Sequence, residues 1–282
     1  MAALLLSKKM NQVPLAPSSS FYVALAPYLS LVIHLPCVTI IHKQSAFYMK
    51  HLFILLALTL TLGSCTSATE SKGVDAILAF YGGKLNYAKG VSATTEDKLQ
   101  GKFYELKLTG IGEKIKQHFT SFQLPASNCA YLFYEALSSE ERQNYAFIRV
   151  NIEGEKTNYE FAMQDLAKVE QAMSLVTHSV NDIRAQDYNR FLAKGNPQAS
   201  SPSEWQQAKP TFIAADREYG SVKEFSLQGF EFMQQNLSSG TEQFVRMAGV
   251  LVREKNNTDF TFIVAPTASL QSQYLYGFAF EK

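Results

Sequence analysis

Cysteine is scarce in this chain, whose 282 residues contain only Cys37, Cys65 and Cys129. The first two lie within or directly after hydrophobic stretches near the N-terminus, which leaves Cys129 alone in the rest of the chain. A single thiol cannot form an intramolecular disulfide. A catalytic cysteine needs a basic partner, and His118 and His178 are the only histidines after Cys65. We therefore expect Cys129 to be buried as a small apolar side chain.

Acidic residues are absent from residues 1–64, whose positive side chains other than histidine are Lys8, Lys9, Lys43 and Lys50. The remaining 218 residues hold 22 Lys and Arg against 25 Asp and Glu, a net charge of about −3. Such a weakly acidic chain lacks the basic surface that nucleic acids require, so we expect no nucleic-acid partner. Its length suffices for one large domain or two small ones.

Motifs for metals, cofactors and catalysis are also lacking. His178 and Asp182 share a helix face at i and i+4, but no His-x-Glu or Cys-x-x-Cys run supplies further ligands, so we expect a hydrogen bond there and no metal. Gly82-Gly83 lacks the lysine and helix start of a phosphate-binding loop. Glu140 and Glu141 are adjacent and point apart on a helix, which suits a solvated first turn. The sequence thus predicts no cofactor and no catalytic residue, and favours a non-enzymatic protein.

A hydrophobic run follows Lys50. Leu52 to Leu62 is an unbroken series of 11 apolar and threonine residues, which suits a signal peptide and is too short to span a membrane. The following Leu62-Gly63-Ser64-Cys65 resembles the lipobox of bacterial lipoproteins. The resemblance implies that residues 49–64 are a signal peptide and that Cys65 becomes an N-terminus carrying acyl chains such as palmitate. The alternative is a secretory signal or hydrophobic anchor that merely ends in cysteine.

Residues 1–48 contain a second apolar stretch, from Phe21 to Ile41, broken by Pro27 and Pro36. Its 21 residues are long enough to span a membrane. However, a lipoprotein signal works at the extreme N-terminus, and a preceding span would bury it. We therefore expect translation to begin at Met49, so that residues 1–48 are an upstream segment without meaningful structure.

A small ββαββ module is predicted over residues 74–163, after a flexible tether over 65–73. Its first hairpin joins an apolar segment, Ala76 to Ala88, to Lys102–Leu108, where apolar and charged side chains alternate. Its second hairpin joins residues 145–152 to 156–163 across Glu153-Gly154-Glu155. Between the hairpins we expect a partly helical stretch over 111–122 that Pro125 stops, a helix capped at Ser127 or Asn128 and ending at Leu137, and a helical turn capped at Ser138.

A long amphipathic helix opens the second predicted domain, residues 164–282. Its apolar side chains recur every three or four residues, at Leu166, Val169, Met173, Val176, Val180 and Ile183. They predict about 30 residues of helix from Gln164 to Gly195, with a kink at Asp187. A second helix runs from Ser203 to about Tyr219, and Pro210 should kink or divide it. Four strands follow, at residues 222–234, 242–254, 259–265 and 274–280, and the first has a shift of parity at Gly229 that indicates a β-bulge.

This order of elements resembles the nuclear transport factor 2-like (cystatin-like) superfamily, in which a bent sheet wraps a long helix around a conical apolar pocket. The resemblance implies an α+β fold and candidate pocket walls at Tyr188, Trp205, Phe212, Phe232 and Tyr276. The simpler interpretation is that these aromatic side chains fill the core. Enzymes of the superfamily place an Asp, His or Tyr deep in the cone, and Asp182, Asp187, His178 and Tyr188 are the candidates here.

Three hypotheses for function follow. The first is an envelope lipoprotein, anchored through Cys65 in the bilayer, that binds or assembles with an envelope protein or a small apolar ligand. We place it in the outer membrane facing the periplasm, ahead of another membrane or the cell surface. The second is a cone-pocket enzyme, an isomerase or hydrolase, with an Asp or His base. In the third, residues 74–163 carry the activity and the C-terminal domain is a spacer.

Overall fold

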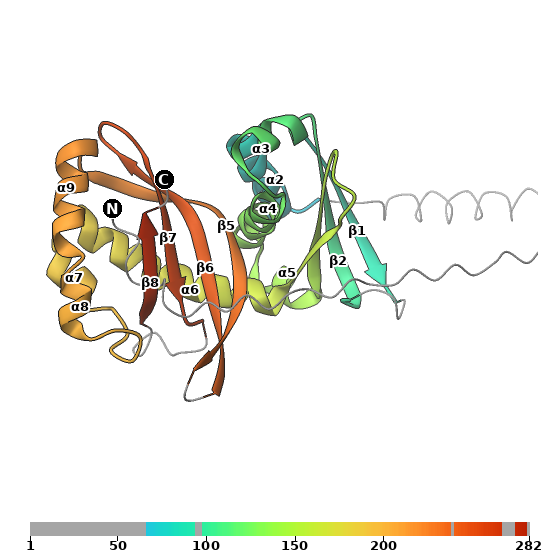
Figure 1. The fold of residues 1–282 in the computed structure, drawn as a ribbon. Helices are drawn as coiled ribbons and strands as arrows, with labels where there is room; N and C mark the ends of the chain where they lie inside the picture. The colour runs from blue at the N-terminus through green and yellow to red at the C-terminus, as the bar shows by residue number, and fades with distance from the viewer. Residues whose placement is uncertain (1–65, 94–97, 238–239, 267–273, 281–282) are drawn as a thin grey trace, which may run out of the picture. The chain divides into compact units, whose positions relative to one another are not determined.

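The computed structural model describes residues 66–93, 98–237, 240–266 and 274–280. Its architecture is α+β, as the sequence predicts, and it contains two four-stranded sheets (Figure 1). The predictions for residues 1–48, for the signal peptide and for acylation of Cys65 lie outside the described residues. From Ser67 onward, the described residues belong to one compact unit.

Helix α2, Ala68–Tyr81, occupies residues for which we expected a flexible tether and the start of a strand. Both expectations are wrong here, because Ser67 and Glu70 form a capping box and Ile77 and Tyr81 are buried on one side of the helix. Gly82 and Gly83 then turn the chain at φ 73° and 75°, where a β-carbon would be strained. The predicted strand is confined to the residues after this turn.

The first sheet consists of β1 (Lys84–Ser92), β2 (Gly101–Thr109), β3 (Phe147–Ile152) and β4 (Tyr159–Ala162), in that order. Both predicted hairpins are confirmed, since β1 pairs with β2 and β3 with β4 in antiparallel fashion. The central pair, β2 and β3, is parallel. A parallel pair needs a long crossover, which the helices α3 (Gly112–His118), α4 (Gln123–Ala136) and α5 (Ser139–Asn144) provide.

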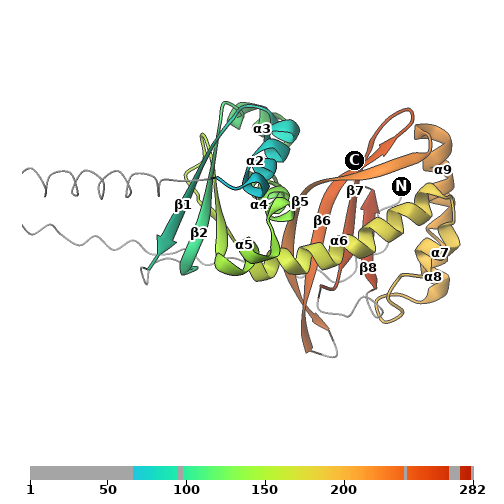
Figure 2. The ribbon, with the colours of Figure 1, turned by 180° about the vertical axis from the view of Figure 1, so that it is seen from behind.

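Helices α2 and α4 pack together against one face of this sheet (Figure 2). On that face Tyr104, Leu106 and Leu108 of β2 are at most 1% exposed, which confirms the predicted alternation. Helix α4 begins four residues before the expected cap at Ser127, so that cap is wrong. Pro125 lies in the first turn of α4, where its missing N–H has no helical partner to lose. As expected, Cys129 in this helix is fully buried.

The predicted long helix is divided in two. Helix α6, Met163–Arg184, ends before Gln186, whose φ of 57° breaks the helix. Asp187 caps the short helix α7, Tyr188–Leu192, as its side chain accepts a hydrogen bond from the Arg190 amide. The kink expected at Asp187 is therefore confirmed. The second predicted helix is also divided, into α8 (Pro202–Gln206) and α9 (Lys209–Tyr219), with Pro210 in the first turn of α9.

The second sheet is an antiparallel meander of β5 (Val222–Leu237), β6 (Gly240–Arg253), β7 (Thr258–Val264) and β8 (Leu275–Phe280). The register of β5 against β6 shifts between Leu227 and Gly229, which confirms the predicted bulge. A β-carbon on Gly229 would lie 2.3 Å from the Leu124 carbonyl oxygen, so α4 approaches the bulge too closely for a larger residue. The Ser127 hydroxyl accepts a 2.8 Å hydrogen bond from the Phe230 amide at the same place.

The two sheets are joined without a linker. Strand β4 ends at Ala162 and α6 begins at Met163. Helix α4 contacts the first sheet as well as β5 and α6, which belong to the second half of the fold, from Met163 onward. The division predicted between residues 163 and 164 thus falls at a change from strand to helix, inside one continuous core.

Candidate functional site

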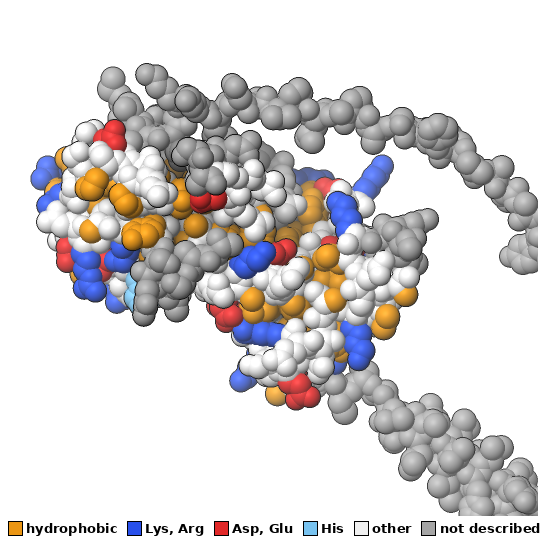
Figure 3. Space-filling view, turned by 90° about the horizontal axis from the view of Figure 1, so that it is seen from below, with side chains coloured by type: hydrophobic (Ala, Val, Ile, Leu, Met, Phe, Trp, Pro, Cys, Tyr) orange, Lys and Arg blue, Asp and Glu red, His pale blue; other side chains and the backbone are white. Residues whose placement is uncertain are grey.

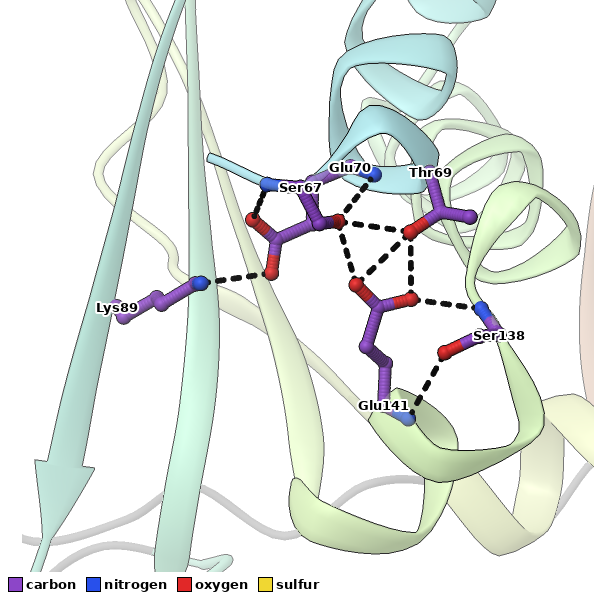
Figure 4. A network of polar contacts seen from close by, with 6 residues as sticks. All are labelled: Ser67, Thr69, Glu70, Lys89, Ser138 and Glu141. Carbon is purple, nitrogen blue, oxygen red and sulfur yellow. Dashed lines mark hydrogen bonds and ion pairs between the residues drawn. The ribbon is translucent and has the colours of Figure 1, made fainter. Parts of the chain in front are cut away.

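The start of α2 holds a connected polar cluster, formed by Ser67, Thr69, Glu70, Lys89, Ser138 and Glu141 (Figure 4). Two capping boxes meet there. In the first, the Ser67 hydroxyl accepts a 3.0 Å hydrogen bond from the Glu70 amide and the Glu70 carboxylate accepts a 2.9 Å bond from the Ser67 amide. In the second, Ser138 and Glu141 make the same exchange at 3.2 and 2.7 Å. Each box satisfies amide groups that a helix start leaves unpaired.

Glu141 connects the two boxes. Its carboxylate accepts hydrogen bonds from the Ser67 hydroxyl and, at 2.7 Å, from the Thr69 hydroxyl. Burial disfavours the charged form of Glu141, but the bonds from Ser67, Thr69 and Ser138 outweigh it and lower the pKa of this carboxyl to about 2. The ionised carboxylate thus holds the first turn of α2 against the first turn of α5. We had expected a solvated first turn at Glu140 and Glu141, and only Glu140 is exposed.

Glu70 is the charged residue buried most deeply in this cluster, at 1% exposure. Its carboxylate lies 2.7 Å from the Lys89 ammonium of β1. Burial opposes its ionisation, but Lys89 and the Ser67 amide lower the pKa of Glu70 below its ordinary value. The hydroxyls of Tyr87 and Tyr104 are buried beside it, and burial together with the Glu70 charge raises the pKa of both phenols. The cluster therefore holds fixed charges and no group that exchanges protons near neutral pH.

The interior of the second half is filled with aromatic rings. Tyr188, Trp205 and Phe212 are 5, 4 and 0% exposed. The Phe212 ring lies 5.8 Å from that of Tyr188, and both Phe212 and Trp205 contact Phe278 of β8. The Trp205 indole donates a 3.2 Å hydrogen bond to the Asn196 carbonyl. Three of the five predicted pocket residues therefore belong to one aromatic cluster, in which Tyr188 packs on Phe212 and Trp205 is connected to Phe212 through Phe278.

Phe232 and Tyr276, the other two predicted pocket residues, lie elsewhere. The Tyr276 ring packs on Phe244 and its hydroxyl donates a 3.0 Å hydrogen bond to Glu242. Phe232 borders an open hollow of about 380 Å³ beside Phe161 and Phe230. The rim of the hollow carries the carboxylates of Glu160, Asp165 and Glu231, which pair with Arg149, Lys168 and Arg246 at 2.7 to 2.8 Å.

Tyr188 contacts an ion pair between Asp216 and Arg253 that the sequence did not predict. Its hydroxyl donates a hydrogen bond to Asp216 of α9, and burial and this carboxylate raise the pKa of Tyr188. The side chain of Arg253 from β6 has no exposed surface, and it contacts Asp216 at 2.6 Å and the Gly220 carbonyl at 2.8 Å. Asp216 is thus held as the counter-ion of an arginine and is not available as a free base.

The other candidates for the catalytic base of a cone-pocket enzyme are Asp182, His178 and Asp187, and the structure places each of them in another role or on the surface. Asp182 is buried but forms an ion pair with Lys194 and lies 3.5 Å from Arg190. His178 is exposed on the same helix, and the hydrogen bond expected with Asp182 is therefore replaced by the pair with Lys194. Asp187 caps α7. None of the described residues forms a cluster of three or more His, Cys, Asp or Glu that could hold a metal ion.

Charges are mixed on the surface that Figure 3 shows, where Lys and Arg side chains alternate with Asp and Glu around apolar side chains. No helix within the described ranges is both long and apolar enough to cross a membrane. No family model, curated protein or solved structure matches the chain.

Two site features could have been found from the sequence, and two could not. Ser67-x-x-Glu70 and Ser138-x-x-Glu141 both match the spacing of a capping box, but we had recognised a helix start only in the second. The bond from Ser67 to Glu141 joins residues 74 positions apart and the pair of Asp216 and Arg253 joins residues 37 apart. Side chains so distant in the chain carry no local signal of their pairing.

Proposed function

We propose that this protein is a bacterial envelope lipoprotein, anchored to a membrane through acyl chains on Cys65, whose folded part is a non-enzymatic binding or assembly module. The observation that carries the proposal is the position of Cys65. It directly follows an 11-residue apolar run and Gly63-Ser64, and it lies two residues before the N-cap of the first described helix. Cleavage before Cys65 would therefore remove the apolar run and leave the described fold complete.

Acylation explains why the described part of the chain needs no spanning helix of its own. Two or more acyl chains give stable anchoring, at roughly 0.8 kcal/mol for each buried methylene group. We place the protein in the outer membrane facing the periplasm, and an inner-membrane or surface location would rest on the same anchor.

The pairing of the most deeply buried carboxylates among the described residues supports the non-enzymatic part of the proposal. Within the described ranges the buried carboxylates of Glu70 and Asp182 and the half-buried carboxylate of Asp216 each pair with a Lys or Arg. Tyr188, Trp205 and Phe212 are buried, which supports core packing over an open pocket at these side chains. An enzyme with an Asp or His base is the alternative, and it would need a pocket that admits a substrate to one of these groups.

The cystatin-like resemblance is part of the same proposal. Helix α6 packs against β5, and the bulge at Gly229 lies where a bent sheet of this superfamily would need its bend. The fold hosts enzymes and inert modules alike, so it does not by itself favour either function. The hollow beside Phe161, Phe230 and Phe232 is the candidate place for a small apolar ligand or a side chain of an envelope partner.

The proposed anchor is tested by measuring whether Cys65 is acylated. In a bacterial host supplied with labelled palmitate, the full chain should become labelled and sediment with membranes, and Cys65→Ser should abolish both. Cys129→Ser is the matched control, because this buried thiol should not take part. Unlabelled protein, or fractionation unchanged by Cys65→Ser, would rule out the anchor.

A separate experiment distinguishes a binding module from an enzyme. The mature protein is purified from membranes with detergent and searched for co-purifying envelope protein or lipid. A partner or apolar ligand that is lost when Phe232 is replaced by Asp would support a binding module. Turnover of an ester or ketone substrate that is lost in Asp182→Asn would favour the enzyme.

A further inference from the structure

The distance between the anchor and the folded body is very short. Thr66 is the only residue between Cys65 and Ser67, the N-cap of α2. Because consecutive Cα atoms are 3.8 Å apart, the Cα atoms of Cys65 and Ser67 lie within about 8 Å of each other in any conformation of Thr66. A lipoprotein with a polar tether of ten or more residues would allow its folded part several times this reach.

Helix α2 cannot easily unwind to lengthen this connection. Its first turn is held by the bonds from Ser67 and Thr69 to Glu141, and by the ion pair of the buried Glu70 with Lys89. One turn later the helix is packed closely on α4, since a β-carbon on Gly73 would lie 2.7 Å from a ring carbon of Phe133. Freeing even four residues would expose Glu70 and leave Lys89 and Glu141 without these partners.

The surface next to Ser67 is one end of the first sheet. Glu70 contacts Lys89 near the end of β1, and Ser92 at that end pairs with Gly101 at the start of β2. The last turn of α5 is brought to the same end, since the Ala146 amide bonds to the Lys102 carbonyl at 2.7 Å. Val91 is 70% exposed there, the largest exposed fraction among the large apolar side chains described.

From these contacts we propose that this end of the sheet, formed by Lys89, Val91, Lys102 and α5, rests on the lipid headgroups of the membrane that holds the anchor. The inference depends on acylation of Cys65 as proposed above. Val91 then enters the headgroup region, where an apolar side chain gains from leaving water. The Lys102 ammonium group faces lipid phosphates, while Lys89 keeps its ion pair with Glu70. The opposite end of the sheet, with Gly110 and the turn at Glu153–Lys156, faces away from the bilayer. From Lys102 to Leu108 alone, β2 covers about 20 Å.

Fluorescence quenching by the membrane measures this orientation in the full chain. Val91→Cys and, as the matched control, Lys156→Cys each place a thiol at an exposed position, while Cys65 is acylated and Cys129 is buried. Each variant is expressed in an acylating host, labelled with a thiol-reactive fluorophore, and incorporated into phosphatidylcholine vesicles that contain a nitroxide-headgroup lipid. Because the two positions differ by at least about 20 Å, we expect at least about twofold more quenching at position 91.

A second variant separates orientation from anchoring. Twenty Gly and Ser residues inserted between Thr66 and Ser67 give a tether with a mean reach of about 25 Å. The inserted chain should still sediment with membranes, and the difference in quenching between positions 91 and 156 should disappear.

The outcomes distinguish the two proposals. Protein that sediments with membranes but is quenched equally at both positions, or more strongly at position 156, overturns the orientation and leaves acylation intact. Protein that stays in the soluble fraction and takes up no labelled palmitate overturns the acylation, and the orientation with it.

Discussion

The hydroxyl of Ser67 donates a hydrogen bond to the carboxylate of Glu141, a residue 74 positions further along the chain. Glu141 also closes the capping box of its own helix, α5, through the Ser138 amide at 2.7 Å. One carboxylate therefore fixes the starts of two helices. This explains how a chain that begins its fold within two residues of Cys65 keeps that beginning in place.

Replacing Glu141 by Ala should destabilise the protein by about 2–3 kcal/mol, because hydrogen bonds to a charged group contribute about 1.5–3 kcal/mol and the cap of α5 is lost as well. The midpoint of urea unfolding should fall with little change in slope. Glu140→Ala is the control, since its exposed side chain should change stability by less than about 0.5 kcal/mol. Equal effects of the two substitutions would show that the link from Ser67 to Glu141 is not stabilising.

Acid should weaken this link over a defined range of pH. The pKa of Glu141 falls from an ordinary 4.5 to about 2 on folding, so its stabilisation is complete above pH 4.5 and is lost as the pH falls towards 2. Urea midpoints measured from pH 5 to pH 2 should therefore decline less steeply in Glu141→Gln than in the unsubstituted protein. Some decline should remain in the variant, because folding also lowers the pKa of Glu70. Parallel pH profiles would contradict the assignment.

The buried pair of Asp216 and Arg253 should show strong coupling. Arg253→Met leaves the Asp216 carboxylate without its cation and should cost about 3–5 kcal/mol, as breaking buried pairs generally does. The double variant Arg253→Met with Asp216→Asn should cost clearly less than the two single changes added together. Arg217→Ala, at an exposed position on α9, is the control. Additive effects in the double-mutant cycle would show that the pair does not act as a unit.

Phe212 tests whether the interior of the second half is filled. Phe212→Ala should cost about 3–5 kcal/mol and leave a cavity, and an apolar cavity of this kind can bind benzene or xenon. Benzene should therefore raise the thermal midpoint of the variant and leave that of the unsubstituted protein unchanged. The neighbouring Ile213 is 41% exposed, so Ile213→Ala should show neither effect. Stabilisation of the unsubstituted protein by benzene would indicate an open pocket and favour the enzyme hypothesis.

Local patterns predicted much of the fold because the signals lie within a few residues of one another. The apolar stripe of α6 predicted that helix, and the parity shift at Gly229 predicted the bulge of β5. At α2 the polar composition of residues 66–73 was misleading, although Ser67 and Glu70 have the spacing of a capping box. The start of α4 was missed because Pro125 was treated as a stop, whereas a first turn tolerates proline.

The candidate site was less predictable than the fold. Acylation of Cys65 was inferred from a contiguous motif. The bonds of Glu141 to Ser67 and of Arg253 to Asp216 depend on how α5 meets α2 and how β6 meets α9. The five aromatic candidates for pocket walls illustrate the same limit, since Phe232 and Tyr276 lie apart from the other three. Residue type predicted the burial of Tyr188, Trp205 and Phe212, and only the packed structure determines which rings touch.

Burial of Cys129 makes oxidation of this protein informative about its processing. Folding hides that sulfur completely, and burial raises the pKa of its thiol, so air should not crosslink properly matured copies. A covalent dimer on a non-reducing gel would then consist of molecules that escaped acylation or lost their folded state. Under the proposed acylation of Cys65, the ratio of dimer to monomer would report how efficiently a cell acylates and folds the chain.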